Sequence, residues 1–189
     1  EKKRAWHAGK SYWKGKVDIN SLSIGIELDY SPSAANNRFT KNLQFTLINL
    51  LKRLISKYKI LPENILGHSD IAPYRKIDPG KQFPWSILEN AKIKTKIKKI
   101  KKNKIFKKLI YKWFLKNKFY SKKKRILLML NYIGYDTSLA LKNKLNYNQL
   151  ILAYSNRYRF YKNYSYNKKQ IKSVIELHFL NIILTKIKK

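Results

Sequence analysis

The sequence predicts an α/β fold in its first half and a small all-helical domain in its second half. Apolar and polar residues alternate strictly at residues 23–29, which is typical of a half-buried strand, and leucines then recur at helical spacing over residues 40–58. The later part of the chain is helical in pattern throughout. We therefore expect an α/β domain over residues 1–90, a lysine-rich linker over 91–123 and a helical domain over 124–189.

The composition supports a folded chain and limits its chemistry. With 189 residues, 44% of them hydrophobic, the chain can form one good core and a small second one. It contains no cysteine, so disulfides and thiolate ligands are excluded, and any metal must be held by His, Asp or Glu. No apolar run approaches the roughly 18 residues that a membrane-spanning helix needs.

The formal net charge of +33 predicts attraction to polyanions, namely nucleic acid, anionic lipid or acidic wall polymers. Lysine, however, accompanies Ile, Asn and Tyr along the whole chain, as expected from A- and T-rich coding sequence. We therefore interpret much of the charge as residue bias and expect no specific nucleic-acid partner.

A loop with two tryptophans and several small residues spans positions 4–15. Aromatic faces and a few polar groups are what small-ligand pockets use, so Trp6, His7 and Ala8 are candidates for substrate binding. For His7 the alternative is aromatic packing around a histidine with satisfied hydrogen bonds, which we favour over metal ligation.

The alternating segment at residues 23–29 is expected to be a strand with two different faces. Ile24, Ile26 and Leu28 share the face that packs on a core, and Glu27 lies on the other face beside a glycine. A glutamate in this place can act as a general base if a substrate and a metal-bound water lie against it. The alternative is a polar face that is simply solvated.

Residues 40–58 are expected to form a helix that covers the apolar face of this strand, with Thr40 as its N-cap. Pro62 ends the helical stretch, and residues 65–68 are expected to form a short strand. Phe-Pro-Trp at residues 83–85 then opens another helix, because proline is tolerated in a first turn.

The loop at residues 67–80 collects the residue types of a zinc site: His68, Lys76 and Asp78. Imidazole and carboxylate are good zinc ligands, and a catalytic site needs three protein ligands and one open position. The metal would activate a water and polarise a carbonyl, and Lys76 could stabilise the developing oxyanion. The alternative is a surface loop in which the spacing of His68 and Asp78 is accidental.

The lysine-rich stretch at residues 91–123 allows two interpretations. Its isoleucines, Ile93, Ile97 and Ile100, are spaced as in a basic amphipathic helix that could lie on an anionic membrane or on nucleic acid. A linker between domains is the interpretation that we favour; a peripheral membrane contact through this stretch stays open.

Three helices are expected in the remainder, at residues 125–133, 148–161 and 168–186, the first of them capped by Gly134. His178 shares a stripe with apolar residues and is interpreted as a partly buried packing residue rather than a ligand.

Four motifs together resemble one enzyme family, the zinc-dependent N-acetylmuramoyl-L-alanine amidases, whose fold is shared with the peptidoglycan recognition proteins. They are Trp-His-Ala-Gly at 6–9, Ser-Ile-Gly-Ile-Glu-Leu at 23–28, Pro-Glu-Asn-Ile-Leu-Gly-His-Ser-Asp-Ile-Ala-Pro at 62–73, and Arg-Lys-Ile-Asp-Pro-Gly with Phe-Pro-Trp at 75–85.

The resemblance implies hydrolysis of the amide that joins N-acetylmuramic acid to L-alanine in peptidoglycan or its fragments. By the same resemblance, His68 and Asp78 match zinc ligands, and Glu27 and Lys76 match catalytic residues. Trp6, His7, Ala8 and Arg75 are assigned to substrate binding. The implied fold is a mixed central β-sheet flanked by helices.

The sequence departs from the family in one respect. The family's first zinc ligand is a histidine on a strand before the Trp-His-Ala-Gly segment, and Glu1 lies too close to that segment to leave room for it. We expect a sheet that is incomplete at its N-terminus, from a truncated amidase or from a binding module that has lost catalysis.

The second half is similar to a three-helix peptidoglycan-binding domain. This pairing resembles the AmiD type of amidase, an envelope lipoprotein, so we expect a location in the periplasm or at the outer membrane of a bacterium. We also expect a monomer.

Overall fold

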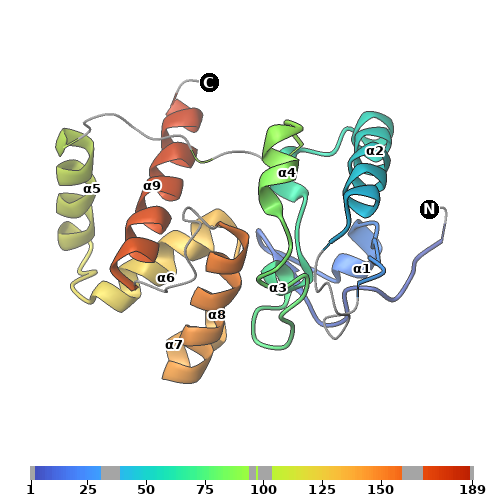
Figure 1. Ribbon diagram of the computed structural model, residues 1–189. Coiled ribbons are helices and arrows are strands. Elements are labelled where there is room, and N and C mark those ends of the chain that lie inside the picture. Colours follow the sequence, from blue (N-terminus) through green and yellow to red (C-terminus); the bar gives the residue numbers. More distant parts are fainter. Residues whose placement is uncertain (1–2, 31–38, 94–96, 98–103, 159–167, 188–189) are drawn as a thin grey trace.

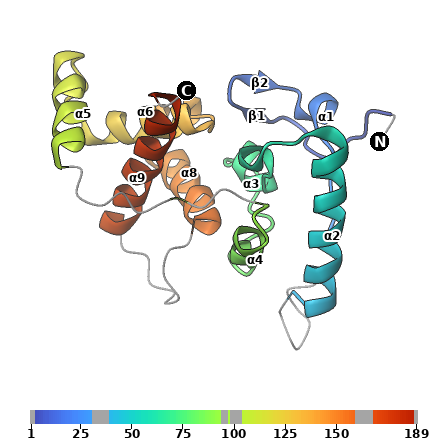
Figure 2. The same ribbon diagram turned by 90° about the horizontal axis from the view of Figure 1, so that it is seen from above.

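The structure is a computed structural model that describes residues 3–30, 39–93, 97, 104–158 and 168–187. Two groups of helices lie side by side, and we name them the N-terminal half (residues 3–93) and the C-terminal half (residues 104–187) (Figure 1). The short helix α3 lies at the boundary, in contact with α8 of the other half (Figure 2).

The N-terminal half holds a small hairpin, a long helix and short helical turns. Its elements are β1 (Tyr12–Trp13), β2 (Lys16–Val17), α1 (Ile19–Leu22), α2 (Lys41–Tyr58), the 3₁₀ turn η1 (Pro62–Asn64), α3 (His68–Ile71) and α4 (Trp85–Asn90). The C-terminal half contains α5 (Lys104–Lys116), α6 (Lys122–Ile133), α7 (Ser138–Lys142), α8 (Lys144–Arg157) and α9 (Lys168–Ile187).

The expected central sheet is not formed by the residues that the structure describes. There, the one ladder is the antiparallel pairing of β1 with β2, and the predictions of strands at 23–29 and 65–68 are wrong. A strand is held by hydrogen bonds to a neighbour, and the described residues pair no neighbour with either segment. At 65–68 a local preference also intervenes, because the carboxylate of Asp70 accepts a hydrogen bond from the Gly67 amide and starts α3 at His68.

The predicted helix at 40–58 is confirmed as α2. The Thr40 hydroxyl accepts a hydrogen bond from the Leu43 amide, and Leu47 and Leu51 are buried. They pack in an apolar cluster with Phe83, Trp85 and Leu88 near the start of α4, and Ile26 and Leu28 lie against the same cluster. The two-faced character of 23–29 therefore survives without a sheet, although Ile24 is 39% exposed.

A larger core joins the two halves. It contains Ala8, Trp13 and Ile71 from the N-terminal half, together with buried residues of α6, α8 and α9. Phe114 of α5 is 3% exposed in this core, so part of the stretch predicted to be a linker is a packed helix. The prediction for Ile100 falls outside the described residues.

The helices predicted in the C-terminal half are present. Helix α6 ends before Gly134, whose φ of 138° serves the C-cap, and α6 packs on α9. Residues 159–161, at the end of one predicted helix, lie outside the described part of the chain. His178 is half-buried and its Nδ1 lies 3.2 Å from the Tyr154 hydroxyl, as a packing role predicts. No helix among the described residues is both long and apolar enough to cross a membrane.

Candidate metal site

The loop that follows α3 brings His68 and Asp78 together. The Asp78 carbonyl accepts a hydrogen bond from the Ser69 amide at 2.9 Å, which closes the loop, and the ring of Pro79 packs so tightly on Gly67 that a Cβ there would lie 2.6 Å from it. His68 Nδ1 is consequently 3.0 Å from Asp78 Oδ2. Two residues ten positions apart thus form one pair of potential metal donors.

The second ring nitrogen of His68 determines what this pair can bind. Nε2 lies 3.1 Å from the Ala8 carbonyl, and because a carbonyl only accepts, Nε2 carries a proton. Nδ1 then either carries a second proton toward Asp78 or presents its lone pair toward a carboxylate, an arrangement that a bound cation would stabilise. A metal-binding histidine typically donates its other N–H to a carbonyl or carboxylate, as here.

The pair fits two corners of a zinc site. Zinc bonds of about 2.0–2.1 Å place neighbouring tetrahedral ligands about 3.4 Å apart, close to the observed separation. A catalytic zinc site needs a third protein ligand. In the part of the chain that the structure describes, no group of three or more His, Asp or Glu side chains could hold an ion.

Glu27 is exposed, on the polar side of the 23–29 segment. That side lies against His7: the Ser23 hydroxyl is 2.8 Å from His7 Nε2, and a Cβ on Gly25 would come within 2.6 Å of His7 Cβ. Exposure alternates over the end of the segment, where Ile26 and Leu28 are half-buried and Glu27 is exposed. Its catalytic role stays a prediction, since no described contact joins Glu27 to His68 or Asp78.

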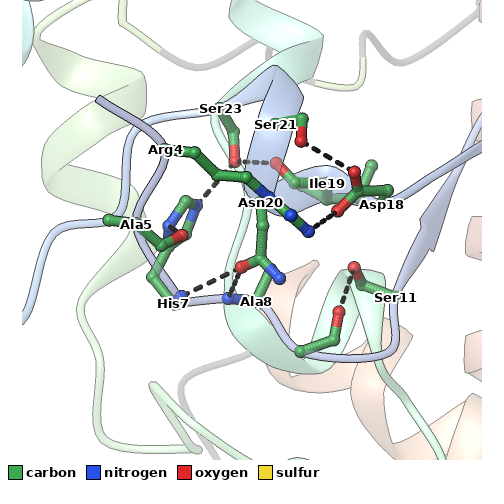
Figure 3. Close-up of polar contacts among 11 residues, drawn as sticks. Arg4, Ala5, His7, Ala8, Ser11, Asp18, Ile19, Asn20, Ser21 and Ser23 are labelled. Carbon is green, nitrogen blue, oxygen red and sulfur yellow. Dashed lines mark hydrogen bonds and ion pairs between the residues drawn. The ribbon is translucent and has the colours of Figure 1, made fainter. Parts of the chain in front are cut away.

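The side chain of Asn20 holds the segment at residues 6–8 through its backbone amides (Figure 3). Asn20 Oδ1 accepts hydrogen bonds from the amides of His7 at 2.9 Å and Ala8 at 2.7 Å, and His7 Nδ1 lies 2.9 Å from the Ala5 carbonyl. His7 is therefore a histidine with satisfied hydrogen bonds. Trp6 is 81% exposed and Ala8 is buried, so of this trio the Trp6 ring offers the most surface to a ligand.

Asn20 was not identified from the sequence. It lies in the four-residue helix α1, which Asp18 precedes. Asp18 accepts hydrogen bonds from the Ser21 hydroxyl and from Arg4, and these lower the pKa of its carboxyl, Ser21 more than Arg4. A single buried asparagine in a short polar segment carries no periodic signal, so only the tertiary contacts reveal its role.

The side chains of the consecutive residues Arg75 and Lys76 have different neighbours. The Arg75 guanidinium donates to the carbonyls of Ala8 at 2.7 Å and Lys10 at 3.0 Å. It therefore holds the 6–10 segment against the loop at residues 67–80, which we call the metal-donor loop. Lys76 is half-buried and lines a small open hollow of about 90 Å³ between this loop and α8. The substrate and transition-state roles assigned to these two residues stay predictions.

Tyr74 ties the same loop to the C-terminal half. Its hydroxyl donates to the Asp136 carbonyl at 2.7 Å and lies 3.3 Å from the Ala140 amide, which donates to it. Burial raises the pKa of Tyr74 to about 12.

Comparison with known proteins finds similarity to one enzyme family over the first half of the chain. Residues 1–81 match the sequence profile of Amidase_2, N-acetylmuramoyl-L-alanine amidase. The chain is 46% identical over 95 residues to the N-acetylmuramoyl-L-alanine amidase AmiD of Escherichia coli K12, covering 47% of this chain and 34% of that protein. It is 45% identical over 84 residues to the 1,6-anhydro-N-acetylmuramyl-L-alanine amidase AmpD of Enterobacter cloacae, covering 44% and 43%.

Solved structures match over both halves. AmiD from E. coli, in complex with the substrate anhydro-N-acetylmuramic acid-L-Ala-D-gamma-Glu-L-Lys, matches 96% of this chain and 70% of that chain, with a TM-score of 0.72 and 27% identity. AmpDh3 from Pseudomonas aeruginosa, in complex with an anhydromuramic pentapeptide, matches with a TM-score of 0.71 and 26% identity over 97% and 71%. The chain spans less than half the length of these curated relatives, AmiD and AmpD.

Proposed function

We propose, from the match of residues 1–81 to the N-acetylmuramoyl-L-alanine amidase family, that this chain serves zinc-dependent cleavage of peptidoglycan or muropeptides. The bond cleaved would be the amide between N-acetylmuramic acid and L-alanine. The observation that carries the proposal is the His68–Asp78 pair, with Nδ1 and Oδ2 3.0 Å apart and the Nε2 proton directed at the Ala8 carbonyl. Imidazole nitrogen and carboxylate oxygen are both zinc ligands, and the contact of Nε2 with a carbonyl is the one that a metal-binding histidine typically makes.

His68 Nδ1 and the Asp78 carboxylate would hold the zinc, together with a third protein ligand that the described residues do not supply. When bound, zinc lowers the pKa of a coordinated water to about 7 and polarises the substrate carbonyl. Arg75 would keep the 6–10 segment in place, and through it the Ala8 carbonyl that orients the His68 ring.

Glu27 would act as the general base and Lys76 as the cation that faces the developing oxyanion. Support for Glu27 comes from its exposed side chain, in the same segment whose Ser23 hydroxyl lies 2.8 Å from His7 Nε2. The exposed ring of Trp6 would offer a flat apolar surface to the sugar or peptide of a muropeptide.

A second candidate function is a peptidoglycan-binding module without catalysis. One observation favours it: the described residues bring two metal donors together and no third. The match of both halves to AmiD and AmpDh3 is compatible with either function. An envelope location, which follows the AmiD resemblance, and a monomeric state are part of the proposal, to be checked by cell fractionation and by light scattering.

Zinc content and muropeptide cleavage separate the two candidates. The purified 189-residue chain would be measured for bound zinc by elemental mass spectrometry, and then incubated with an anhydro-muropeptide and with intact peptidoglycan. An amidase releases the free peptide, detected by mass spectrometry, and His68→Ala removes both zinc and cleavage. A chain that binds peptidoglycan but releases no peptide, at saturating zinc, contradicts the enzymatic proposal and supports the binding module.

A further inference from the structure

A buried ion pair connects the metal-donor loop to the C-terminal half. Asp70 stands two positions after His68, and Arg157 is the last residue of α8. Arg157 Nη1 lies 2.6 Å from Asp70 Oδ2, and the two side chains are only 2% and 1% exposed. A charge in such a site is tolerated only when it is paired and hydrogen-bonded, so each residue depends on the other.

The pair has partners on both sides of His68. Asp70 also accepts hydrogen bonds from the Gly67 amide at 2.7 Å and from the Tyr135 hydroxyl at 2.5 Å. Arg157 Nη2 donates to the Ile65 carbonyl, and the guanidinium lies over the Trp85 ring, 4.6 Å from its centroid. The guanidinium therefore binds the chain on both sides of His68, at Ile65 and at Asp70.

Arg157 and Tyr135 keep their protons at neutral pH. Burial, the largest single influence, would lower the pKa of Arg157, but Asp70, Tyr158 and Tyr135 together outweigh it and the pKa is raised. Burial, reinforced by the same carboxylate, raises the pKa of Tyr135 well above its ordinary value. Both groups thus remain protonated donors across the physiological range.

We propose that Arg157 and Tyr135 are positioning residues, through which the C-terminal half holds His68 and Asp78 in metal-binding geometry. The connection is short: Asp70 is bonded to Gly67, and the adjacent Ser69 amide is bonded to the Asp78 carbonyl. A shift of Asp70 would therefore change the position of His68 relative to Asp78. The metal-binding part of this inference rests on the proposed function, whereas the holding of the loop does not.

Hydrogen exchange on the metal-free full-length chain tests the holding of the loop. Arg157→Met should accelerate exchange of the Gly67 and Ser69 amides by about tenfold or more, because local opening no longer breaks the ion pair, while exchange in α2 stays unchanged. Arg157→Lys should give an intermediate rate, since lysine supplies a charge but not the fork that reaches both Asp70 and Ile65.

Two further variants keep the test decisive. Arg125→Met is the matched control, because Arg125 bonds the backbone carbonyls of Phe119 and Tyr120 within the C-terminal half. Tyr135→Phe removes one hydrogen bond without leaving an unpaired charge, and should accelerate exchange of the Gly67 and Ser69 amides by about threefold. This variant carries the test if Arg157→Met does not fold. The proposal is overturned if the folded Arg157 and Tyr135 variants exchange at the wild-type rate, or if exchange accelerates equally throughout the chain.

Zinc titration separates this inference from the proposed function. If Arg157→Met weakens zinc binding about tenfold or more and Arg125→Met does not, the positioning role extends to the metal. If the wild-type chain binds no zinc but the exchange result holds, the proposed function fails and the holding of the loop stands. If zinc affinity is equal in wild type and Arg157→Met, the positioning of the metal donors is refuted.

Discussion

The two segments that carry the proposed chemistry are held in opposite ways. The metal-donor loop is anchored by buried groups: Asp70 and Arg157 pair out of solvent, and Tyr74 bonds across to the C-terminal half. The 23–29 segment has an exposed polar side, and is held by half-buried Ile26 and Leu28 and by the contact of Ser23 with His7. The metal donors therefore lie on the more constrained segment and the proposed base on the less constrained one.

The largest effect is expected for Glu27, on activity alone. A general base contributes about 10²–10⁴-fold, so Glu27→Ala should reduce muropeptide turnover by that factor. Because the side chain is exposed, the free energy of unfolding should change by less than about 0.5 kcal/mol. Turnover, zinc content and urea unfolding would be measured on the same preparation. A variant that retains wild-type turnover identifies Glu27 as the wrong base.

Asp70 is expected to give the largest effect on stability. Asp70→Ala leaves Arg157 as a buried charge without its carboxylate, and breaking such a pair costs about 3–5 kcal/mol. Asp29→Ala, on the exposed side of the other segment, is the control and should cost less than about 0.5 kcal/mol. Urea unfolding followed by circular dichroism measures both. Equal values for the two variants would remove the contrast between the segments.

Gly25 tests how closely the 23–29 segment lies on His7. A Cβ at this position would be 2.6 Å from His7 Cβ and Cγ, so Gly25→Ala must push the two segments apart. Overpacking of this kind costs about 1–3 kcal/mol. The matched substitution two residues further along the chain, Glu27→Ala, adds no atoms at a contact and serves as the control. A neutral Gly25→Ala variant would indicate that the contact yields freely.

Tyr74 is expected to produce the smallest effect, confined to alkaline pH. Its pKa is raised from 10.0 to about 12 in the folded chain, so the folded state binds more protons than the unfolded state between these values. The stabilisation is fully present below about pH 10 and is lost as pH rises toward about 12. Tyr74→Phe should make this alkaline decline of the melting temperature shallower than Tyr120→Phe does, since the Tyr120 side chain is exposed. Identical alkaline profiles would contradict the raised pKa.

Local patterns in the sequence determined the helices and one pair of donors. The leucine spacing and the Thr40 cap specify α2, and Gly134 marks the end of α6, because a helix is selected by interactions within a few residues. The Gly- and Pro-containing loop likewise indicated that His68 and Asp78 could meet. The alternation at 23–29 correctly separated Ile26 and Leu28 from Glu27, since the two faces of an extended segment depend only on its period.

Only the tertiary structure decided which segments pair and which polar residues hold the loop. Asp70 and Arg157 are 87 positions apart, and Asn20 reaches the amides of His7 and Ala8 from a different turn. Strand pairing depends on long-range neighbours in the same way, which explains why the predicted strands at 23–29 and 65–68 did not appear. A buried polar residue or a strand gains its free energy from partners that are distant in sequence, so no local pattern can specify it.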